Sequence, residues 1–248
     1  MEAYEYATMR HIEDDYWWYR GLRRLVQDSA RRCFGSRPWR VLDAGCGTGG
    51  QIEALKPHFP AMEVWGIDIS SLAVGFTRSR GVRTLALATT LRLPFPSACF
   101  DAVFSLDILQ SRGLRLSAGL HELARVLRPG GYLFLNLPAF ASLAGQHDLA
   151  VNIERRYLLP EVLAAVSATD LRPVRAFYWD VALFPLAYLL RRLRRAGSPE
   201  TPTSDLFMLP TPLNWLLTRW ILFEVRLARR VRFPFGTSVF VLAQRRAH

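Results

Sequence analysis

The sequence has almost no lysine, few cysteines and no long apolar run. Of its 32 basic residues only Lys56 is a lysine, and a GC-rich genome produces such an arginine bias without selection for anion binding. The three cysteines lie far apart and lack the spacing of zinc ligands, so we expect reduced structural thiols and neither a metal site nor a disulfide framework. The longest apolar run, residues 181–190, is far shorter than the roughly 18 to 20 residues that span a bilayer.

The N-terminal sequence also lacks the pattern of a secretory signal. Such a signal has a basic start followed by an apolar stretch, whereas residues 1–15 are acidic and aromatic. We therefore expect a cytoplasmic protein. With 248 residues, half of them hydrophobic, the chain has enough material for one large core and one insertion, which excludes a disordered protein.

The net charge of +11 is concentrated in one late segment. Residues 181–235 hold nine arginines against three acidic residues, whereas the preceding 180 residues are nearly balanced. A basic segment of this kind, with apolar helical faces, is able to lie on an anionic membrane surface. Because the charge is local, we do not expect a nucleic acid as partner.

Helical and strand patterns alternate along the chain. Amphipathic or capped segments predict helices at 18–34, 70–80, 121–131 and 159–170. Short apolar runs rich in β-branched and aromatic residues predict strands at 39–42, 62–68, 83–87, 100–107, 132–138, 172–180 and 237–246. This order favours a parallel sheet covered by helices on both faces, with ligands at the carboxyl ends of the strands.

The sequence divides into four parts. Residues 1–37 form an N-terminal helical lid, 38–180 a cofactor-binding core, and 236–248 the final strand of that core. Between them, residues 181–235 are predicted to be a helical, arginine-rich insertion that expands the loop of a C-terminal β-hairpin and caps an acceptor site. Residues 198–204 read as the polar link between the two helices of this insertion.

A glycine-rich turn follows the first predicted strand. Gly45, Gly47 and Gly50, with Asp68 further on, satisfy the dinucleotide fingerprint, and they equally suit a loop that binds S-adenosylmethionine. Asp43 favours the second interpretation, because a carboxylate at the loop repels a diphosphate but attracts a sulfonium and an ammonium. Asp68 is able to accept hydrogen bonds from both ribose hydroxyls. A tight turn that holds no ligand is the third alternative.

Four segments resemble, in the usual order, the motifs of class I S-adenosylmethionine-dependent methyltransferases. They are VLDAGCGTGG, GIDIS, LRLPFPSACFDAVFSLDILQ and ELARVLRPGGYLF, over about residues 39–140. DDYWWYRGLRRLV, HDLAVNIERRYLLPEVL and LFMLPTPLNWLLTRWILFE resemble a bacterial subfamily that acts on small molecules. The resemblance implies an α/β fold with a doubly wound, Rossmann-like, mostly parallel seven-stranded sheet and an antiparallel last strand. It places the cofactor over the first two strands and the acceptor over the fourth and fifth.

The resemblance also implies which residues contact S-adenosylmethionine, or S-adenosylhomocysteine as product. These cofactor-binding residues are Asp43, Gly45, Cys46, Gly47, Asp68, Ile69, Thr89, Thr90, Leu91 and Leu106. Two positions depart from the family pattern. Thr89 replaces the usual acid that binds the adenine amino group, so adenine recognition is expected to use backbone groups. Gln110 and Ser111 replace a frequent Glu-His pair, so no general base is available there.

Other residues are candidates for binding or covering the acceptor. They are Tyr16, Trp17, Tyr19, Arg20, Asp107 and Gln110. Aromatic side chains exclude water from a transfer site, and an arginine or tyrosine is able to bind the cofactor carboxylate. The alternative for the aromatic stretch is a helix start that Trp18 attaches to the core.

Methyl transfer from a sulfonium is an in-line displacement that needs alignment, exclusion of water and, only for acceptors of high pKa, a base. The candidate catalytic residues are His147, Asp148 and Tyr157, whose alternatives are a surface pair in a loop and a packing tyrosine. The fourth strand is followed by SLDILQ rather than the Asn/Asp-Pro-Pro-aromatic motif of amino-adenine and N4-cytosine methyltransferases, which disfavours a nucleobase acceptor.

The sequence therefore predicts methyl transfer from S-adenosylmethionine to a small or lipid-like acceptor, with O-methylation preferred over N-, C- or S-methylation. Three alternatives remain open. A membrane-associated lipid or quinone methyltransferase would show the arginines of 181–235 on one flat face. A protein or peptide methyltransferase would need an open groove in place of a cap. A non-catalytic scaffold would keep the fold without the activity.

Overall fold

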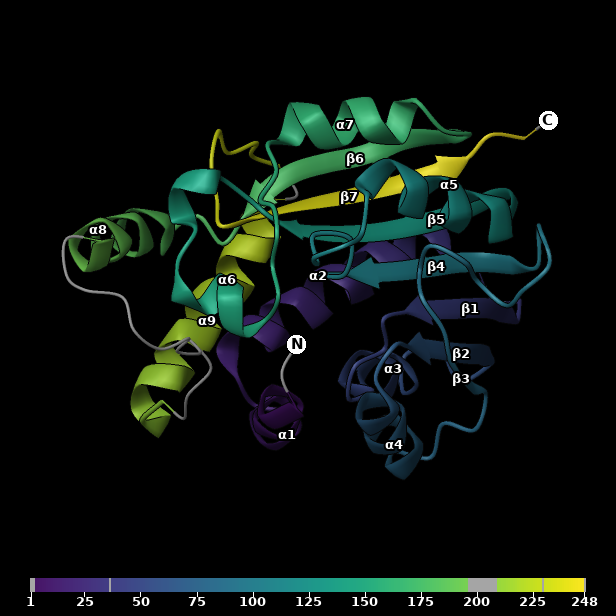
Figure 1. Cartoon of the computed structure of the whole chain (residues 1–248), viewed down its shortest axis with the longest axis horizontal. Coiled ribbons are helices and arrows are strands. Elements are labelled where there is room, and N and C mark those ends of the chain that lie inside the picture. Colours follow the sequence, from purple (N-terminus) through teal and green to yellow (C-terminus); the bar gives the residue numbers. More distant parts are fainter. Residues whose placement is uncertain (1–2, 36, 196–208, 229, 248) are drawn as a thin grey trace.

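The computed structural model describes residues 3–35, 37–195, 209–228 and 230–247, so the predicted link at 198–204 lies outside the described residues. Figure 1 shows strands gathered into one sheet with helices around it. The elements in chain order are α1 Ala3–Ile12, α2 Trp17–Cys33, β1 Trp39–Ala44, α3 Gly50–Leu55, β2 Met62–Asp68, α4 Ser71–Ser79, β3 Leu85–Leu87, β4 Phe100–Leu106, α5 Leu116–Val126, β5 Leu127–Pro138, η1 Ala141–Leu143, α6 Gln146–Ala150, α7 Leu159–Ser167, β6 Leu171–Trp179, α8 Phe184–Arg195, α9 Thr211–Leu227 and β7 Ser238–Arg245.

The sheet has seven strands in the order β3-β2-β1-β4-β5-β7-β6. Strand β7 runs antiparallel to both of its neighbours, and all other pairs are parallel. The predicted fold class is confirmed. Helices α8 and α9 lie in the chain between β6 and β7, which pair from Leu171 opposite Arg245 to Trp179 opposite Ser238. The C-terminal hairpin with a helical insertion in its loop is therefore present.

Side chains alternate between two cores on the two faces of the sheet. On β5, Leu133, Leu135 and Leu137 belong to the core formed with α5 and α7, whereas Phe134 belongs to the core formed with α2 and α9. Successive residues of a strand point to opposite faces, so a strand with apolar residues at every position must be covered on both sides. Figure 1 shows α5 and α7 on the near side and α2 passing behind the sheet.

Helices α2 and α9 pack closely against each other near the N-terminal end of α2. A Cβ atom on Gly21 would lie 2.6 Å from Ile221, so only glycine permits this approach. The Asn214 side chain accepts a hydrogen bond from the backbone N–H of Trp17 (3.0 Å) and donates one to the Asp15 carbonyl (2.9 Å). Helix α9 thereby satisfies an unpaired amide at the start of α2 and fixes the aromatic stretch that begins there.

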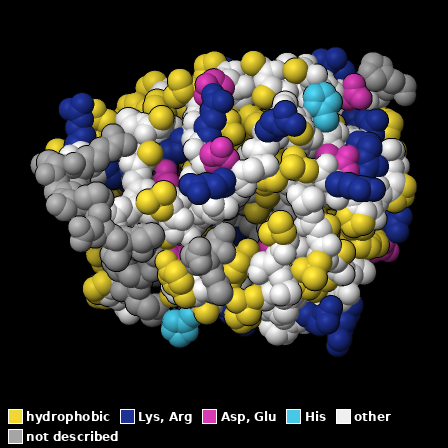
Figure 2. Space-filling view, in the orientation of Figure 1, with side chains coloured by type: hydrophobic (Ala, Val, Ile, Leu, Met, Phe, Trp, Pro, Cys, Tyr) yellow, Lys and Arg dark blue, Asp and Glu magenta, His cyan; other side chains and the backbone are white. Residues whose placement is uncertain are grey.

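Helix α1 is a feature that the spacing of apolar residues did not single out. It packs against α4 and places Tyr6 beside the end of β2, where the Tyr6 hydroxyl donates to Asp68. Strands β1, β2 and β4 end on the same side of the sheet (Figure 1). Figure 2 shows a hollow near the middle of the face in view. Within the described residues, no helix is both long and apolar enough to cross a bilayer.

Candidate functional site

The glycine loop after β1 uses backbone conformations that favour glycine. Gly45, Gly47 and Gly49 have φ angles of 98°, 52° and 83°. A Cβ on Gly45 would lie 2.2 Å from the Ile108 side chain, so a larger residue would displace the segment after β4. The backbone N–H of Gly47 donates to Asp68 at 3.0 Å, which joins the loop to the end of β2. The loop is therefore a fixed cradle with little room for side chains.

Two buried carboxyl groups border this loop. Asp43 lies at the end of β1 and is 2% exposed, and its pKa is raised to about 7 by burial and by the nearby carboxylates of Asp68 and Glu13. Asp68 accepts hydrogen bonds from the Ser70 N–H (2.9 Å) and the Tyr6 hydroxyl (3.3 Å), while burial raises its pKa. Buried like charges disfavour ionisation unless a cation is close. This end of the site therefore favours a positively charged ligand.

Glu13 connects the N-terminal segment to the loop. Its carboxylate makes ion pairs with Arg23 of α2 (3.1 Å) and with Arg80 (2.7 Å), the C-cap residue of α4, and accepts a hydrogen bond from the Thr48 hydroxyl. Both arginine side chains are at most one tenth exposed. These contacts hold the segment that carries Glu13 over the glycine loop.

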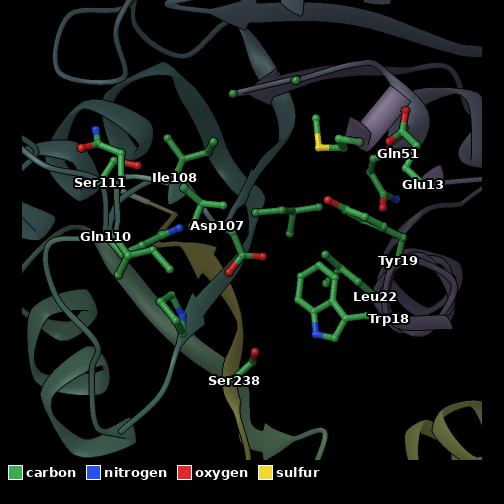
Figure 3. A pocket seen from close by; sticks show the side chains of 18 of the residues that line it. Glu13, Trp18, Tyr19, Leu22, Gln51, Asp107, Ile108, Gln110, Ser111 and Ser238 are labelled. Atoms are coloured by element: carbon green, nitrogen blue, oxygen red, sulfur yellow. The ribbon is translucent and has the colours of Figure 1, made fainter. Parts of the chain in front are cut away.

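A cavity of about 550 Å³ extends from the glycine loop to the far side of the aromatic stretch, within the roughly 300 to 1,000 Å³ typical of ligand pockets. Figure 3 shows residues from α2 facing residues of the segment after β4 across it. The side chains that line its far end come from α2, from the segments that follow β4 and β6, from α6 and from α8: Trp18, Asp107, His147, Asp180, Leu183 and Ala187.

Asp107 is a carboxyl group at the far end of the cavity. It follows β4 with a φ of 57°, and the Asn136 amide donates to both of its oxygens, at 3.0 and 2.8 Å. Burial raises its pKa to about 6, against the lowering effect of Asn136 and Arg156. In Figure 3 its carboxylate and the Ser238 hydroxyl point into the same part of the cavity. The cavity thus has acidic groups at both ends and aromatic walls between them.

Comparison with known proteins identifies the central part of this arrangement. Residues 42–135 match a family model described as a methyltransferase domain. A demethylmenaquinone methyltransferase of Deinococcus radiodurans is 35% identical over 158 residues, covering 60% of this chain and 61% of that protein. A malonyl-[acyl-carrier protein] O-methyltransferase of Herminiimonas arsenicoxydans is 32% identical over 169 residues, covering 65% of this chain and 64% of that protein. Residues 42–135 form a class I S-adenosylmethionine-dependent methyltransferase domain.

The chain spans just under two thirds of the length of both of these curated relatives. Solved structures share the fold of the methyltransferase domain at low identity. Geranyl diphosphate C-methyltransferase from Streptomyces coelicolor A3(2) matches with a TM-score of 0.58 and 18% identity, covering 89% of this chain and 79% of that one. The [4+2]-cyclase SpnF matches with a TM-score of 0.62 and 19% identity, covering 94% and 87%.

The residues of the site fit the cofactor of this methyltransferase domain, S-adenosylmethionine. The carboxylates of Asp43 and Asp68 suit a ligand that carries a sulfonium and an ammonium group, and they would repel a diphosphate. The Thr90 hydroxyl oxygen, which also lines the cavity, is buried and has no hydrogen-bond partner in the described part of the chain. It is therefore available to a polar group of a bound ligand.

The methyltransferase cavity brings together most of the predicted cofactor-binding residues. Its lining includes Asp43, Gly45, Cys46, Gly47, Asp68, Ile69, Thr89, Thr90 and Leu106. Leu91 lies apart from them, outside the lining, with 37% of its side chain exposed. Ile69 is 79% exposed although it borders the cavity, so it stands at the rim.

Most of the predicted lid residues also line the cavity, and one does not. Tyr16, Trp17 and Tyr19 line the cavity, as does Trp18, whose indole stacks on Trp179 at 5.6 Å between ring centroids. Arg20 is exposed and lies outside the lining. The aromatic stretch therefore both attaches α2 to the core and forms a wall of the methyltransferase cavity. Asp107 and Gln110 also line it.

The three predicted catalytic residues occupy different surroundings. His147 of α6 lines the cavity. Asp148 is buried and accepts two hydrogen bonds from the Arg156 guanidinium, at 2.6 and 2.7 Å. Tyr157 lies in the hydrophobic core, 5% exposed and outside the lining. The geometry therefore brings only His147 of these three side chains to the cavity.

Sequence reasoning missed several side chains that the structure brings to this cavity. Glu13 and Tyr6 lie in a segment whose polar and aromatic residues show no clear stripe, and only their tertiary partners reveal them. Asp180 directly follows β6, as Asp107 follows β4. The rule that ligands bind at the carboxyl ends of strands would have found Asp180 had it been applied to the sixth strand.

Proposed function

We propose that the chain transfers a methyl group from S-adenosylmethionine to a small, lipid-like acceptor, with O-methylation preferred. The observation that supports this best is the single cavity that joins Asp43 and Asp68 to a wall of Trp18, Leu183 and Ala187. Relatives named for demethylmenaquinone, malonyl-acyl carrier protein and fatty acids carry the same kind of domain. Their names favour an apolar acceptor over a nucleobase.

When bound, S-adenosylmethionine supplies an electrophilic methyl group on a positively charged sulfur. We assign the other tasks to this chain's residues. Asp68 accepts hydrogen bonds from ribose hydroxyls, Asp43 provides negative charge near the cationic part of the cofactor, and Thr90 offers a buried hydroxyl. Tyr16, Trp17 and Tyr19 exclude water from the transfer site.

The three candidate catalytic residues differ in how directly they would act on the acceptor. His147 is placed to contact an acceptor because it lines the cavity. Asp148 acts instead by holding Arg156, and Tyr157 by packing beneath the end of β5, where its backbone N–H donates to the Pro138 carbonyl at 2.9 Å. Replacing His147 should therefore affect transfer more selectively than replacing Asp148 or Tyr157, whose loss should also reduce stability.

A transfer assay tests the proposed function. Protein, S-adenosylmethionine and one acceptor at a time would be incubated, the acceptors being reduced demethylmenaquinone, a long-chain fatty acid and a malonyl thioester. We expect one of them to gain a methyl group by mass spectrometry, with loss of product in Asp68→Ala and full product in Asp170→Asn, a surface aspartate. Because a cyclase shares the fold, cofactor binding without any methylated product would contradict transfer and favour a scaffold.

A second proposed role is contact with an anionic membrane through α9, within the segment 181–235. The outer face of this helix has large apolar side chains at helical spacing, each at least 36% exposed: Leu213, Leu216, Trp220, Phe223 and Leu227. Trp215 is 62% exposed. The inner face of α9, with Ile221 and Val225, is buried against α2. A surface helix normally has one apolar face, so the second face requires a partner.

The charges on α9 favour a negatively charged partner. Arg219 and Arg226 are exposed, whereas Glu224, the acidic residue of the helix, is buried and accepts hydrogen bonds from the backbone N–H groups of Val181 and Ala182. Tryptophan, arginine and leucine on one exposed helical face are typical of a helix that lies in the interface of an anionic bilayer. Ala187 of α8 and Leu183, the residue before this helix, line the cavity, so a lipid-like acceptor would be close to the cavity entrance.

Sedimentation with vesicles tests membrane contact. We expect the protein to sediment with phosphatidylglycerol vesicles but not with phosphatidylcholine vesicles, and to be released by salt. The variant Trp220→Glu/Phe223→Glu should remain in solution, whereas Val174→Glu, an equally exposed apolar position on β6, should sediment like the unchanged protein. If the protein forms dimers through α9 and does not sediment with phosphatidylglycerol vesicles, this proposal is overturned.

A further inference from the structure

Asp180 is a buried carboxyl group whose hydrogen bonds are incomplete. It follows β6 with a φ of 56° and is 4% exposed. Its Oδ2 accepts a hydrogen bond from the Thr237 hydroxyl at 2.5 Å, whereas its Oδ1 is buried and has no hydrogen-bond partner among the described residues. Asp180 lines the same cavity as the cofactor-side residues. Buried polar atoms are almost always paired, so an unpaired one in a residue that lines a cavity indicates a place for a ligand group.

The backbone around Asp180 is held firmly. The Thr237 N–H donates to the Asp180 carbonyl at 3.1 Å, and the next two amides donate to the Glu224 carboxylate at 2.8 and 3.2 Å. A Cβ on Gly236 would lie 2.4 Å from the Trp179 carbonyl oxygen, so the returning chain approaches as closely as glycine permits. The side chain is therefore presented in one position rather than left free to find a partner.

The charges near Asp180 contrast with those near Asp148, a buried aspartate that receives two hydrogen bonds from Arg156. Asp180 has the Thr237 hydroxyl and the negative Glu224 beside it. Burial is the main cause that raises its pKa to about 7, and the charge of Glu224 adds to it, against the lowering effect of the Thr237 hydrogen bond. The other charged or titratable side chains that line this end of the cavity include three arginines. Arg156 is paired with Asp148, Arg191 donates to the Leu143 carbonyl, and Arg112 lies in the segment after β4; Asp107 and His147 are the remaining groups.

Asp107 is connected to the residue before Asp180 by hydrogen bonds. The Asn136 amide nitrogen donates to Asp107, and its oxygen accepts from the Trp179 indole N–H at 2.8 Å. Trp179 is the residue before Asp180, so Asn136 supports the segments that carry both carboxyl groups. Figure 3 shows Asp107 pointing into the cavity near Ser238, the residue after Thr237. The acceptor end thus holds two carboxyl groups on a shared support.

We infer that Asp180 Oδ1 accepts a hydrogen bond from the nucleophilic group of the acceptor, which is therefore a hydroxyl or amine rather than a carboxylate. This inference rests on the proposed methyl transfer and names its substrate class. An acceptor hydroxyl donates to Oδ1 while its oxygen lone pair forms the new bond to the methyl carbon. The bond between that carbon and sulfur breaks with its electrons going to sulfur, and the hydroxyl proton passes to Asp180. A carboxylate acceptor has no proton to donate to Oδ1, and the ionised forms of Asp107 and Asp180 would repel it above pH 7.

The pKa of Asp180 agrees with this role, because a base that titrates near neutral pH is able both to accept and to release a proton there.

The raised pKa of Asp180 also affects the stability of the folded protein. A carboxyl group whose pKa rises on folding destabilises the folded state once the pH exceeds its unfolded value of 3.8. The isosteric variant Asp180→Asn removes that charge and should be at least as stable as the unchanged protein above pH 7.

The test compares 4-nonylphenol with 4-nonylbenzoate, which share a tail and differ in the group that meets Asp180. Binding to the protein saturated with S-adenosylhomocysteine would be measured by calorimetry, and transfer from S-adenosylmethionine by mass spectrometry. We expect the phenol to bind at least tenfold more tightly, and Asp180→Asn to lose at least tenfold in phenol binding and transfer. Its affinity for S-adenosylmethionine should stay within twofold, as should that of the control Asp170→Asn.

The possible failures are distinguishable. Absence of S-adenosylmethionine binding in the unchanged protein would contradict the proposed function itself. Cofactor binding together with preference for the benzoate, or unchanged phenol binding in Asp180→Asn, would overturn only the role of Asp180. If neither probe binds, melting temperatures decide: Asp180→Asn should melt no lower than the unchanged protein at pH 8, with the difference disappearing near pH 4. A variant that melts lower at both pH values would show a structural role and overturn the inference.

Discussion

The two ends of the cavity are built from the chain in different ways. The end that we assign to the cofactor comes mainly from one stretch, residues 43–90, in which β1, β2 and β3 are each followed at once by a turn that lines the cavity. Tyr6, Glu13 and Leu106 are added to it from outside this stretch. The acceptor end is assembled from α2, the segments after β4 and β6, α6, α8 and the start of β7. The cofactor end is therefore encoded by local backbone geometry, whereas the acceptor end depends on long-range packing and is free to vary with the acceptor.

The largest expected effect comes from breaking the cofactor end at Gly45. In Gly45→Val the new side chain must adopt a φ of 98° and collide with Ile108, since a Cβ there lies 2.2 Å from that side chain. We expect affinity for S-adenosylmethionine to fall by at least about 100-fold and the free energy of unfolding by about 3 kcal/mol. Calorimetry and urea unfolding measure both. Cofactor binding at the original affinity would contradict the rigid cradle.

Breaking the acceptor end should have an effect that is smaller and separable. Asn136→Ala removes the partner of the Asp107 carboxylate and of the Trp179 indole, and Asn136 is fully buried. We expect the free energy of unfolding to fall by about 2 to 4 kcal/mol and transfer to fall more than tenfold. Cofactor affinity in the folded variant should change less than threefold. Gln244→Ala, a polar position on the neighbouring strand, serves as the control. Equal loss of cofactor binding would show that the two ends are not independent.

The pH dependence of cofactor binding sharpens the comparison further. Because the pKa of Asp43 is raised to about 7 in the free protein, this group is neutral below pH 7 and negative above it. A cationic ligand binds the ionised form better, so affinity should rise by up to about tenfold per pH unit between pH 5 and 7 and then level off. Calorimetry across this range measures the profile. Asp43→Asn should give weak, nearly pH-independent binding, and an unchanged profile in this variant would exclude Asp43 as the titrating group.

The smallest expected effect is at a glycine that neither end uses. Gly75 lies in α4, and a Cβ there would have no atom within 4 Å. Gly75→Ala should raise the free energy of unfolding by about 0.5 to 1 kcal/mol, because alanine loses less conformational freedom in a helix. Cofactor binding should be unchanged. Loss of binding here would mean that Gly45→Val fails for reasons other than the geometry of its turn.

Much of the fold could be predicted because strands and turns have local signals. The runs ending at Asp43, Asp68 and Asp107 are short and apolar, and the glycine turn after the first of them needs positive φ angles that few other residues adopt. The number of strands and the antiparallel direction of the last one followed from the family resemblance. Boundaries were less accurate: β5 begins at Leu127, before the predicted apolar run, because Leu127 pairs with Phe100 across the ladder.

The acceptor end could not be predicted in the same way. Asp180 looked like the last residue of a strand, and only the structure reveals that Thr237 returns beside it. Helix α1 lacks an apolar stripe, and its position depends on Tyr6 meeting Asp68 and on Glu13 meeting Arg23. Asp148 and Tyr157 suggested catalysis from their residue types alone, whereas a guanidinium and a hydrophobic core surround them.

Titration calorimetry with S-adenosylmethionine, S-adenosylhomocysteine and NAD tests the central claim most directly, performed at pH 8 on the unchanged protein, on Asp68→Ala and on the control Asp170→Asn. We expect micromolar binding of the first two ligands, at least tenfold weaker in Asp68→Ala and unchanged in Asp170→Asn, and no binding of NAD. Binding of NAD in place of S-adenosylmethionine, or equal affinity in Asp68→Ala, would contradict a methyltransferase site at the glycine loop.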